Sequence, residues 1–368
     1  MQLGINLGYI GLGSHGHDPA AAAETMTQAA IFADHLGYSV AWVAEAYGSD
    51  APTIMSWIAA KTRSIDVGAA ILQIPARSPA MTAMTAATLD ALSAGRVRLG
   101  LGVSGPQVSE GWHGVRFTSP LGRTREYVEI VQSALRRDRV AYAGRHFTLP
   151  LPDGPGKSLK LTIRPVREHI PIYLASVGPK NLELTGEIAD GWLAIFFSPE
   201  HAGEQVDALR RGRVKAERGT AADPLAGFDI VPTVPVVLTD DVSAGLRRVA
   251  PYAALYIGGM GSREQNFYNQ LACRMGFEKE AALIQDLYLD GRQRDAADAV
   301  PDEFLDATSL VGPKERIAER VRRYADAGVT TLTVAPYSET MEEGAALLQT
   351  MAEVVLGDRS DPSSTTAP

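Results

Sequence analysis

The pattern of apolar and polar residues along this chain predicts strands and helices in alternation. Residues 66–74 (DVGAAILQI) form a continuously apolar run, as expected of a strand that is covered on both faces. A helix over residues 19–36 is predicted because Asp18 and Pro19 are typical of a helix start and Gly37 of a helix end. Strands are predicted at residues 3–10, 40–44, 66–74, 97–103, 172–175, 191–196, 228–238 and 329–334. Helices are predicted at residues 19–36, 51–61, 79–92, 123–137, 181–188, 199–218, 242–255, 313–327 and 340–356.

Eight strands that alternate with helices indicate βαβ units and a parallel sheet, so an α/β fold of the (β/α)8 TIM barrel type is predicted. An open doubly wound sheet is the alternative, and the count of eight strands favours the barrel. Two insertions break the rhythm: one rich in turns near residues 138–170, with a short hairpin expected in it, and a helical one near residues 258–308. Residues 1–356 are therefore predicted to form a single domain, followed by a disordered tail at 357–368.

Composition narrows the classes of function. The net charge of −8, without a cluster of lysine and arginine, argues against a nucleic-acid-binding surface. No apolar run reaches membrane-spanning length, and the N-terminus lacks the features of a signal peptide. Cys273 is the only cysteine, so an intramolecular disulfide is impossible and a reducing compartment is indicated. We therefore expect a cytoplasmic protein of enzyme size, with neither a nucleic-acid nor a membrane partner.

The dinucleotide-binding pattern G-x-G-x-x-G is only weakly supported. It occurs at residues 11–16 and again at 100–105. The helix after the first match begins only near Asp18, and Glu45 lies too far downstream of this match to contact a ribose. The sequence therefore does not support a Rossmann site.

Motifs for metal and nucleophile chemistry are no stronger. His15 and His17 form an H-x-H pair without a second pair of ligands, so solvated loop histidines and no metal are predicted. Cys273 is expected to be a buried helix cysteine, and residues 102–105 miss the nucleophile elbow G-x-S-x-G by register. A bound cofactor is therefore expected to carry the reaction.

The stretch at residues 97–112 joins a predicted strand to a loop suited to a ligand. Gly100 and Gly102 in the strand let another backbone or a ligand come close. The following loop, residues 104–106, presents backbone amides without bulky side chains, as an anion such as a phosphate needs. A tight strand-to-helix turn is the alternative interpretation of this loop.

Five segments of the sequence are distinctive in combination. They are VAWVAEAYGSDAPT (40–53), RVRLGLGVSGPQVSEGWHG (96–114), PLGRTREYVEI (120–130), IPIYLASVGPKNLELTGEIADGW (170–192) and SLVGPKERIAERVRRYADAGVTTLTV (309–334). Together they resemble the luciferase-like oxidoreductases, and most closely the branch that uses the deazaflavin coenzyme F420. The resemblance spans nearly the whole chain, and the order of its blocks agrees with the predicted barrel.

The resemblance implies where the cofactor would lie. A non-prolyl cis peptide in a bulge against the deazaflavin ring would correspond to the bond between Ala70 and Ile71, where an ordinary trans strand is the alternative. The loop at 103–105 would meet the phosphate end of the cofactor through amides, and residues 175–178 would supply facing amides and a hydroxyl, unless they form a plain strand-to-helix turn. The implied cofactor contacts are Ala70, Ile71, Val103, Ser104, Gly105, Ala175, Ser176, Val177 and Gly178.

The resemblance also suggests catalytic and substrate positions. Glu45 aligns with an aspartate that precedes a catalytic histidine in the sugar-phosphate dehydrogenases of this family, but Ala46 replaces that histidine, so their activity is not indicated. Glu45 could orient the ring or shuttle a proton, or be a buried structural acid, and His113 could deliver a proton or be a surface histidine. Trp42 and Trp192 are expected in the core. The candidates for the substrate side are Tyr47, Asp50 and Trp112.

These features predict an oxidoreductase that moves a hydride between C5 of coenzyme F420 and an organic substrate. The alternatives are an FMN-dependent luciferase-like monooxygenase and a non-catalytic flavin-binding protein. Lys180, Arg77 and Arg123 are candidates to meet the anionic tail of F420. Homodimerisation is expected from the resemblance, whereas the substrate and the direction of hydride transfer are left open.

Overall fold

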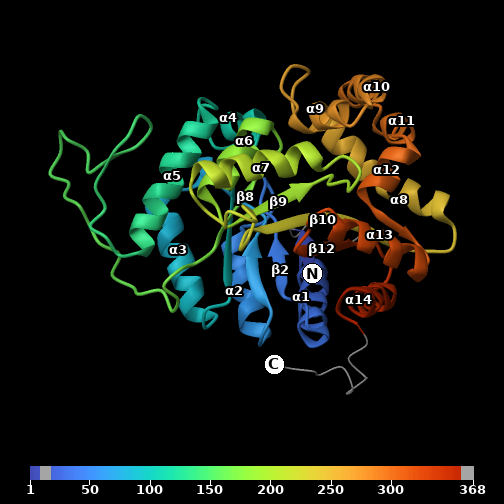
Figure 1. Cartoon of the computed structure of the whole chain (residues 1–368), viewed down its shortest axis with the longest axis horizontal. Helices are drawn as coiled ribbons and strands as arrows, with labels where there is room; N and C mark the ends of the chain where they lie inside the picture. Colours follow the sequence, from blue (N-terminus) through green and yellow to red (C-terminus); the bar gives the residue numbers. More distant parts are fainter. Residues whose placement is uncertain (9–17, 358–368) are drawn as a thin grey trace.

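The computed structural model describes residues 1–8 and 18–357 and shows a closed barrel of eight parallel strands surrounded by helices (Figure 1). Around the barrel the order is β10, β12, β1, β2, β3, β5, β8 and β9, and β9 pairs back onto β10. This closure confirms the predicted TIM barrel. The barrel strands are β1 (Gln2–Gly8), β2 (Val40–Val43), β3 (Asp66–Ala69), β5 (Val97–Gly102), β8 (Ile172–Ala175), β9 (Gly191–Ile195), β10 (Asp229–Leu238) and β12 (Thr331–Pro336).

The helices that surround the barrel begin and end at residues with clear capping roles. The Asp18 side chain accepts from two amides of the first helical turn, and Gly37 ends that helix with φ 81°. Asp50 caps the next helix in the same way. These caps confirm the predicted ends. The surrounding helices are α1 (Pro19–Leu36), α2 (Ala51–Lys61), α3 (Pro79–Leu92), α5 (Pro120–Leu135), α6 (Pro179–Ile188), α7 (Gly203–Lys215), α8 (Val242–Ala254), α13 (Lys314–Asp326) and α14 (Met341–Leu356).

The barrel interior is filled by large rings packed against glycines. Trp42 pairs in register with Gly68, and Tyr173 pairs with Gly191. A Cβ atom at Gly68 would lie 2.3 Å from the Trp42 ring, and one at Gly191 would lie 2.4 Å from Tyr173. The two rings meet edge to face with centroids 5.2 Å apart. Trp42 is thus a core residue as predicted, and so is the buried Trp192.

Charged side chains close the barrel interior at the N-terminal ends of the strands. Arg98 projects inward and pairs with Asp66 at 2.8 Å and with Asp229 at 3.3 Å. The Tyr173 hydroxyl donates to Asp229 at 3.0 Å. Because this end is closed, a ligand can approach the barrel only from the opposite end, where the strands finish and the loops diverge.

A group of helices lies beside α8, next to the C-terminal ends of the strands (Figure 1). It surrounds Phe196, which directly follows β9, and forms a second hydrophobic core. Ring centroids of Phe117 and Phe267 lie 6.3 Å apart, and Arg274 donates to the Val177 carbonyl at 3.1 Å. The group therefore reaches the loops that follow β5 and β8. Its elements are a π-helical turn η2 (Leu255–Gly259), α9 (Phe267–Arg274), α10 (Glu278–Leu289), α11 (Gln293–Asp298) and α12 (Asp302–Thr308).

The turn-rich segment after α5 extends away from the barrel (Figure 1) and contains the expected hairpin. Its strands β6 (Tyr142–Ala143) and β7 (Thr148–Leu149) pair antiparallel. The tail predicted at 357–368 lies outside the described residues apart from Gly357. That residues 1–356 form one domain with two insertions stays a prediction. Among the described helices, none is long and apolar enough to cross a membrane.

Several elements differ from the sequence-based expectation. The strand predicted at 66–74 ends early: β3 is followed by a cis peptide, by β4 (Leu72–Gln73) and by a 3-10 turn, η1 (Ile74–Ala76). The helix predicted at 199–218 is limited to α7. Two short elements were not predicted, namely α4 (Pro106–Gly111) and β11 (Leu310–Gly312), which pairs with β10 outside the barrel.

Pro232 and Pro235 do not interrupt β10, although a proline normally breaks a strand ladder. The Ile230 amide donates to the Thr330 hydroxyl, and the Ile230 carbonyl accepts from the Thr330 amide, next to β12. Backbone groups of successive strand residues point to alternate sides, so the nitrogen of Pro232, two positions on, also faces the β12 side. On the β12 side, strand pairing begins only at Thr233, after Pro232. Pro235 faces the opposite side, where pairing with β9 ends at Thr233, before Pro235. Each proline therefore faces a side on which no partner residue needs its N–H.

Candidate active site

The peptide bond between Ala70 and Ile71 is cis, which confirms the position implied by the resemblance. The Ala70 amide donates to the Val43 carbonyl at 2.8 Å, and both residues of the bond are half-buried at the C-terminal end of β3. Gly102 on β5 accommodates the Ile71 side chain, because a Cβ atom there would lie 2.9 Å from Ile71. A Cβ atom at Gly100 would overlap the Ala69 carbonyl. Both strand glycines thus make room for protein atoms.

The loops that follow β5 and β8 both present open backbone. Among the described residues, a Cβ atom at Gly105 would meet only the Gln107 side chain, at 3.4 Å, and one at Gly178 would meet nothing within 4 Å. Val103 and Ser104 are half-buried beside Gly105, and Ser104 has a φ of 59°. The two loops therefore leave space that a ligand could fill against their amides.

Ser176 differs from the expectation that it offers a hydroxyl to a ligand. Its side chain is buried and bonded to Thr185. Thr185 donates its own hydroxyl hydrogen to the Asn181 carbonyl, so Ser176 must be the donor of the shared bond. The indole N–H of Trp192 donates a hydrogen bond of 2.9 Å to the Ser176 carbonyl. From this loop, Ala175, Val177 and Gly178 remain as candidate contacts, and Ser176 contributes the shape of the turn.

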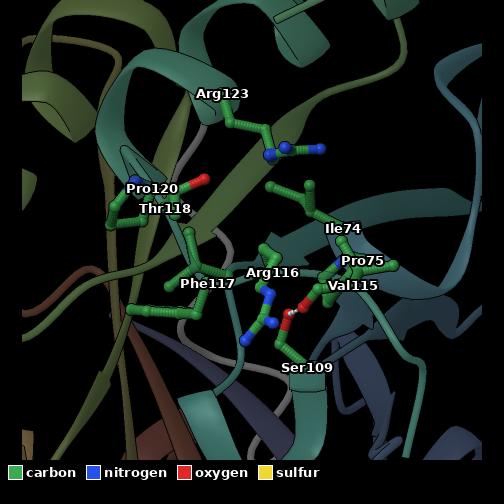
Figure 2. Close-up of a pocket in the computed structure, with 10 residues that line it drawn as sticks. Ile74, Pro75, Ser109, Val115, Arg116, Phe117, Thr118, Pro120 and Arg123 are labelled. Carbon is green, nitrogen blue, oxygen red and sulfur yellow. Dashed lines mark hydrogen bonds between the residues drawn. The ribbon is translucent and has the colours of Figure 1, made fainter.

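A pocket adjoins the β5 loop (Figure 2). Arg123 reaches into it from α5, over Ile74, and its Nε is buried without a hydrogen-bond partner among the described residues. The guanidinium lies 5.8 Å from the Phe147 ring. Arg116 is largely exposed at the pocket rim. The lining residues are Ile74, Pro75, Val103, Ser109, Val115, Arg116, Phe117, Thr118, Pro120 and Arg123.

Glu45 belongs to a tightly bonded ion pair. Its carboxylate accepts two hydrogen bonds from Arg77, at 2.5 and 2.8 Å, and one from each of the Ala51 and Gln73 amides, both at 3.3 Å. Arg77 also bonds Asp50 at 2.5 Å. Burial opposes the charge of Arg77, but the bonds from Glu45 and the charge of Asp50 raise its pKa overall. Glu45 has no free oxygen lone pair directed at a ligand, so the geometry favours a structural acid.

The same ion pair occupies two other predicted site residues, the basic Arg77 and the substrate-side Asp50. Arg77 is committed to carboxylates and is not available for an anionic tail. Asp50 is engaged through both oxygens, since it caps α2 at the Thr53 amide and pairs with Arg77. Lys180 lies exposed in the first turn of α6. Arg123 is thus the one predicted basic residue that lies in the pocket.

His113 lies on the loop after α4 and is bonded to a residue that sequence reasoning missed. Its Nε2 is 2.8 Å from Oε1 of Gln73, a buried residue of β4 that follows the cis peptide by two positions. Gln73 is the one uncharged polar residue in the apolar run at 66–74, a signal that could have identified it. Trp112 and Tyr47 are 67% and 59% exposed, so both side chains are free to meet a substrate.

A set of tyrosines near the end of β9 was also missed. The rings of Tyr252, Tyr256 and Tyr268 pack around Phe196 at centroid distances of 5.6 to 6.5 Å. Burial raises the pKa of Tyr268 to about 12, so its hydroxyl is neutral at physiological pH. Tyr337, after β12, packs against the same cluster. These residues come from separate elements, so no local motif could reveal them.

The remaining sequence candidates lie outside this arrangement. His15, His17 and the first glycine pattern at 11–16 fall outside the described residues. Cys273 on α9 was predicted to be buried, but it is half-buried. Partial burial raises the pKa of its thiol. Within residues 1–8 and 18–357 there is no group of three or more metal-ligating side chains.

Comparisons with known proteins show the family to which the chain belongs. The sequence profile of the family described as luciferase-like monooxygenase matches residues 1–331. A candidate coenzyme F420-dependent oxidoreductase of Mycobacterium tuberculosis is 41% identical over 354 residues, which cover 95% of this chain and 99% of that protein. The 5,10-methylenetetrahydromethanopterin reductase of Archaeoglobus fulgidus is 28% identical, covering 81% of this chain and 85% of that protein.

Two solved structures share the fold. The coenzyme F420-dependent tetrahydromethanopterin reductase of Methanopyrus kandleri superposes with a TM-score of 0.79 at 21% identity, covering 96% of this chain and 98% of the other. An F420-dependent secondary alcohol dehydrogenase in complex with an F420-acetone adduct superposes with a TM-score of 0.74 at 17% identity, covering 97% and 98%.

Proposed function

This chain belongs to the luciferase-like monooxygenase family, and from that premise we propose that it is an oxidoreductase that uses coenzyme F420. The proposal includes hydride transfer between the cofactor and a small organic substrate. The use of F420 is supported by the 41%-identical relative, a candidate coenzyme F420-dependent oxidoreductase, and the reduction of an organic molecule by the likeness to the reductase from Archaeoglobus fulgidus. FMN is the alternative cofactor, since the family description includes monooxygenases.

The residues of this chain fit such a cofactor in three ways. The cis bond at Ala70 presents a half-buried backbone surface at the end of β3. Gly105 and Gly178 leave space over their loops, because among the described residues an added Cβ atom would meet only the Gln107 side chain at Gly105 and nothing within 4 Å at Gly178. Arg123 carries a buried Nε that has no hydrogen-bond partner among the described residues, in the pocket next to the β5 loop. The Arg123 position carries the proposal most directly, because a guanidinium without a carboxylate partner in the described part of the chain is suited to a phosphate.

The assignment of roles follows from this fit. Ala70 and Ile71 would support the ring, and the backbone of Val103, Ser104, Gly105, Ala175, Val177 and Gly178 would hold the phosphate end with Arg123. Coenzyme F420, when bound, supplies hydride transfer at C5 of its ring. The chain itself orients the reactants and excludes water, and the contact of Phe117 with Phe267 extends cover from α9 to the β5 side of the barrel.

His113 is the proposed proton-handling residue on the substrate side, with Tyr47 and Trp112 as substrate contacts. Glu45 would act indirectly, by holding Arg77 and the Gln73 amide in place. Asp50 would contribute through the same ion pair. The chemical identity of the organic substrate is open in this proposal.

A fluorescence titration of the purified protein with coenzyme F420 and, in parallel, with FMN tests the cofactor. We expect saturable binding of F420 and much weaker binding of FMN. Arg123→Gln should weaken F420 binding about tenfold, corresponding to ~1.4 kcal/mol. Lys180→Gln removes a charge that is exposed in the first turn of α6 and does not line the pocket, and it serves as the control, with affinity unchanged.

Three other outcomes, from the titration or from a later substrate screen, would each contradict a different part of the proposal. Preference for FMN would indicate a flavin monooxygenase, to be followed by oxygen consumption. Binding of F420 without turnover of any substrate in a broad screen would indicate a binding protein. Equal affinity of the Arg123 and Lys180 variants would move the phosphate site away from this pocket.

A further inference from the structure

We infer that Gln73 is a positioning residue that holds His113 in the tautomer with hydrogen on Nε2, leaving Nδ1 as the ring atom that can accept a proton. The catalytic meaning of this inference rests on the proposed function, whereas its structural content does not. Gln73 is 1% exposed, so its amide has no water to bond and depends on protein partners.

The bonds of the Gln73 amide determine which of its ends faces the histidine. One end lies 2.7 Å from the Ala46 carbonyl oxygen. A carbonyl oxygen can only accept, so this end must be the NH2 group of the amide. The amide oxygen is then the atom 2.8 Å from His113 Nε2. The orientation of the amide is thus fixed by a backbone atom on a different loop.

The consequence for the imidazole follows from the same donor and acceptor rules. An amide oxygen can only accept, so Nε2 of His113 must carry a hydrogen in both the neutral and the charged ring. A neutral imidazole has one N–H, and Nδ1 therefore carries the lone pair. Without the Gln73 contact, either nitrogen could carry the hydrogen, and the ring could turn about its side-chain bonds.

Gln73 also links the histidine to the predicted cofactor surface. It lies opposite Gly102 in the β4–β5 pairing, two positions after the Ala70–Ile71 bond, and its backbone amide donates to Glu45 at 3.3 Å. The segments that follow β2, β3 and β5 therefore meet at this one residue. This arrangement would keep the accepting Nδ1 atom in a constant position relative to the ring-binding bulge.

Nitrogen NMR of the protein labelled with 15N-histidine tests the inference without cofactor or substrate. Spectra recorded at about pH 9, well above the ordinary histidine pKa of about 6.5, report the neutral rings. His113→Gln identifies the His113 signals among those of the seven histidines by their loss. We expect Nε2 of His113 to show the shift of a protonated nitrogen and Nδ1 that of an unprotonated one.

Two variants of Gln73 provide matched controls. Gln73→Met keeps the length of the side chain but removes the acceptor, so the two nitrogen shifts should move toward each other as the tautomers exchange. Gln73→Glu keeps an acceptor toward Nε2 of His113 but removes the NH2 group that bonds the Ala46 carbonyl, so the tautomer should persist although that second bond is lost. A wild-type His113 with hydrogen on Nδ1, or identical patterns in the wild type and the methionine variant, would overturn the inference.

The same variants separate this inference from the proposed function. With F420 bound and an accepted substrate, Gln73→Met should lower kcat at least tenfold with little change in F420 affinity, and Gln73→Glu should restore part of the rate. A kcat that Gln73→Met leaves unchanged would contradict the positioning role. If no F420 binds at all, the proposed function fails while the NMR result still decides the tautomer.

Discussion

At the scale of single residues, Glu45 shows how a buried acid can serve a site without touching its ligand. Glu45→Gln would replace a carboxylate oxygen by an NH2 group that faces the Arg77 guanidinium. We expect a loss of about 2 kcal/mol in the free energy of unfolding, the scale of a hydrogen bond to a charged group. Turnover should fall more than cofactor affinity, because the backbone amide of Gln73 loses its carboxylate acceptor. Urea unfolding and the F420 titration measure the two effects.

Asp50→Asn is the matched control for Glu45. Asparagine caps a helix as well as aspartate, so the variant removes only the exposed part of the Arg77 ion pair. Exposed ion pairs contribute less than about 1 kcal/mol, so the loss of stability should be smaller. If Glu45→Gln leaves turnover unchanged while stability falls, Glu45 is structural only.

Asp34 provides a pH-dependent prediction. Its carboxylate accepts from the amides of Arg63, Ser64 and Ile65 at 2.6 to 3.0 Å. Burial opposes its ionisation, but these bonds lower its pKa overall. A depressed folded pKa gives stability that is present above the unfolded value of about 3.9 and is lost as pH falls through the folded value.

Asp34→Asn should therefore lower the free energy of unfolding by about 1–3 kcal/mol at neutral pH. The difference from the wild type should narrow as pH falls below about 4, where the unfolded aspartate begins to bind a proton. Urea unfolding at a series of pH values measures it. The exposed Asp207→Asn should change stability little at any pH, and an equal effect of both variants would contradict the argument.

The residue scale is also where prediction from sequence was least complete. Glu45 and His113 were predicted as catalytic candidates, a role that stays a prediction, and their partners, Arg77 and Gln73, lie 32 and 40 positions away. Ser176 was expected to offer its hydroxyl and instead donates it to Thr185. The direction of a side chain depends on neighbours brought together by folding, and a local pattern does not contain them.

At the scale of elements, two glycines three positions apart should respond to substitution in opposite ways. Gly105 has a φ of −108°, which any residue adopts, and among the described residues its added Cβ would meet only the Gln107 side chain, at 3.4 Å. Gly105→Leu should leave the unfolding midpoint unchanged and weaken F420 binding at least tenfold, because the leucine would occupy the space over the loop amides.

Gly102→Ala is the control for Gly105→Leu. Its added Cβ would meet Ile71 at 2.9 Å, so the strand or the bulge must shift, at a cost of about 1–3 kcal/mol in stability. Thermal unfolding and the fluorescence titration distinguish the two positions. Unchanged F420 affinity in Gly105→Leu would place the phosphate site elsewhere.

Elements with strong local signals were predicted well, and those set by their neighbours were not. The helices after Asp18 and Asp50 begin where their caps indicate, because a cap is a local interaction. The strand β11 has three residues and exists only through its pairing with β10. The break after Ala69 was expected from the family resemblance, since the continuous apolar run itself predicts an unbroken strand.

At the scale of the whole molecule, the barrel follows from the repeated alternation of strands and helices, whereas the placement of the helical group does not. Phe117 and Phe267 are 150 positions apart and touch, and Arg274 reaches Val177 across 97 positions. Such contacts depend on the curvature of the closed barrel. The sequence therefore predicted that a helical insertion exists without indicating which loops it contacts.

The outer surface of the barrel offers a place for the expected homodimer. Met81, Met84 and Leu92 lie along one face of α3, spaced so that they form a single stripe, and each is at least half exposed. Trp57 on the neighbouring α2 is exposed to a similar degree. Contiguous exposed apolar surface of this kind is typical of an interface between proteins.

We expect size-exclusion chromatography with light scattering to give twice the chain mass for the wild type. Met84→Glu places a charge in the centre of the stripe and should shift the protein to the monomer, because an unpaired charge is costly to bury. Leu283→Glu changes an equally exposed apolar residue on α10, away from α3, and should remain dimeric. A monomeric wild type would refute the dimer, and a dimer in both variants would place the interface on another face.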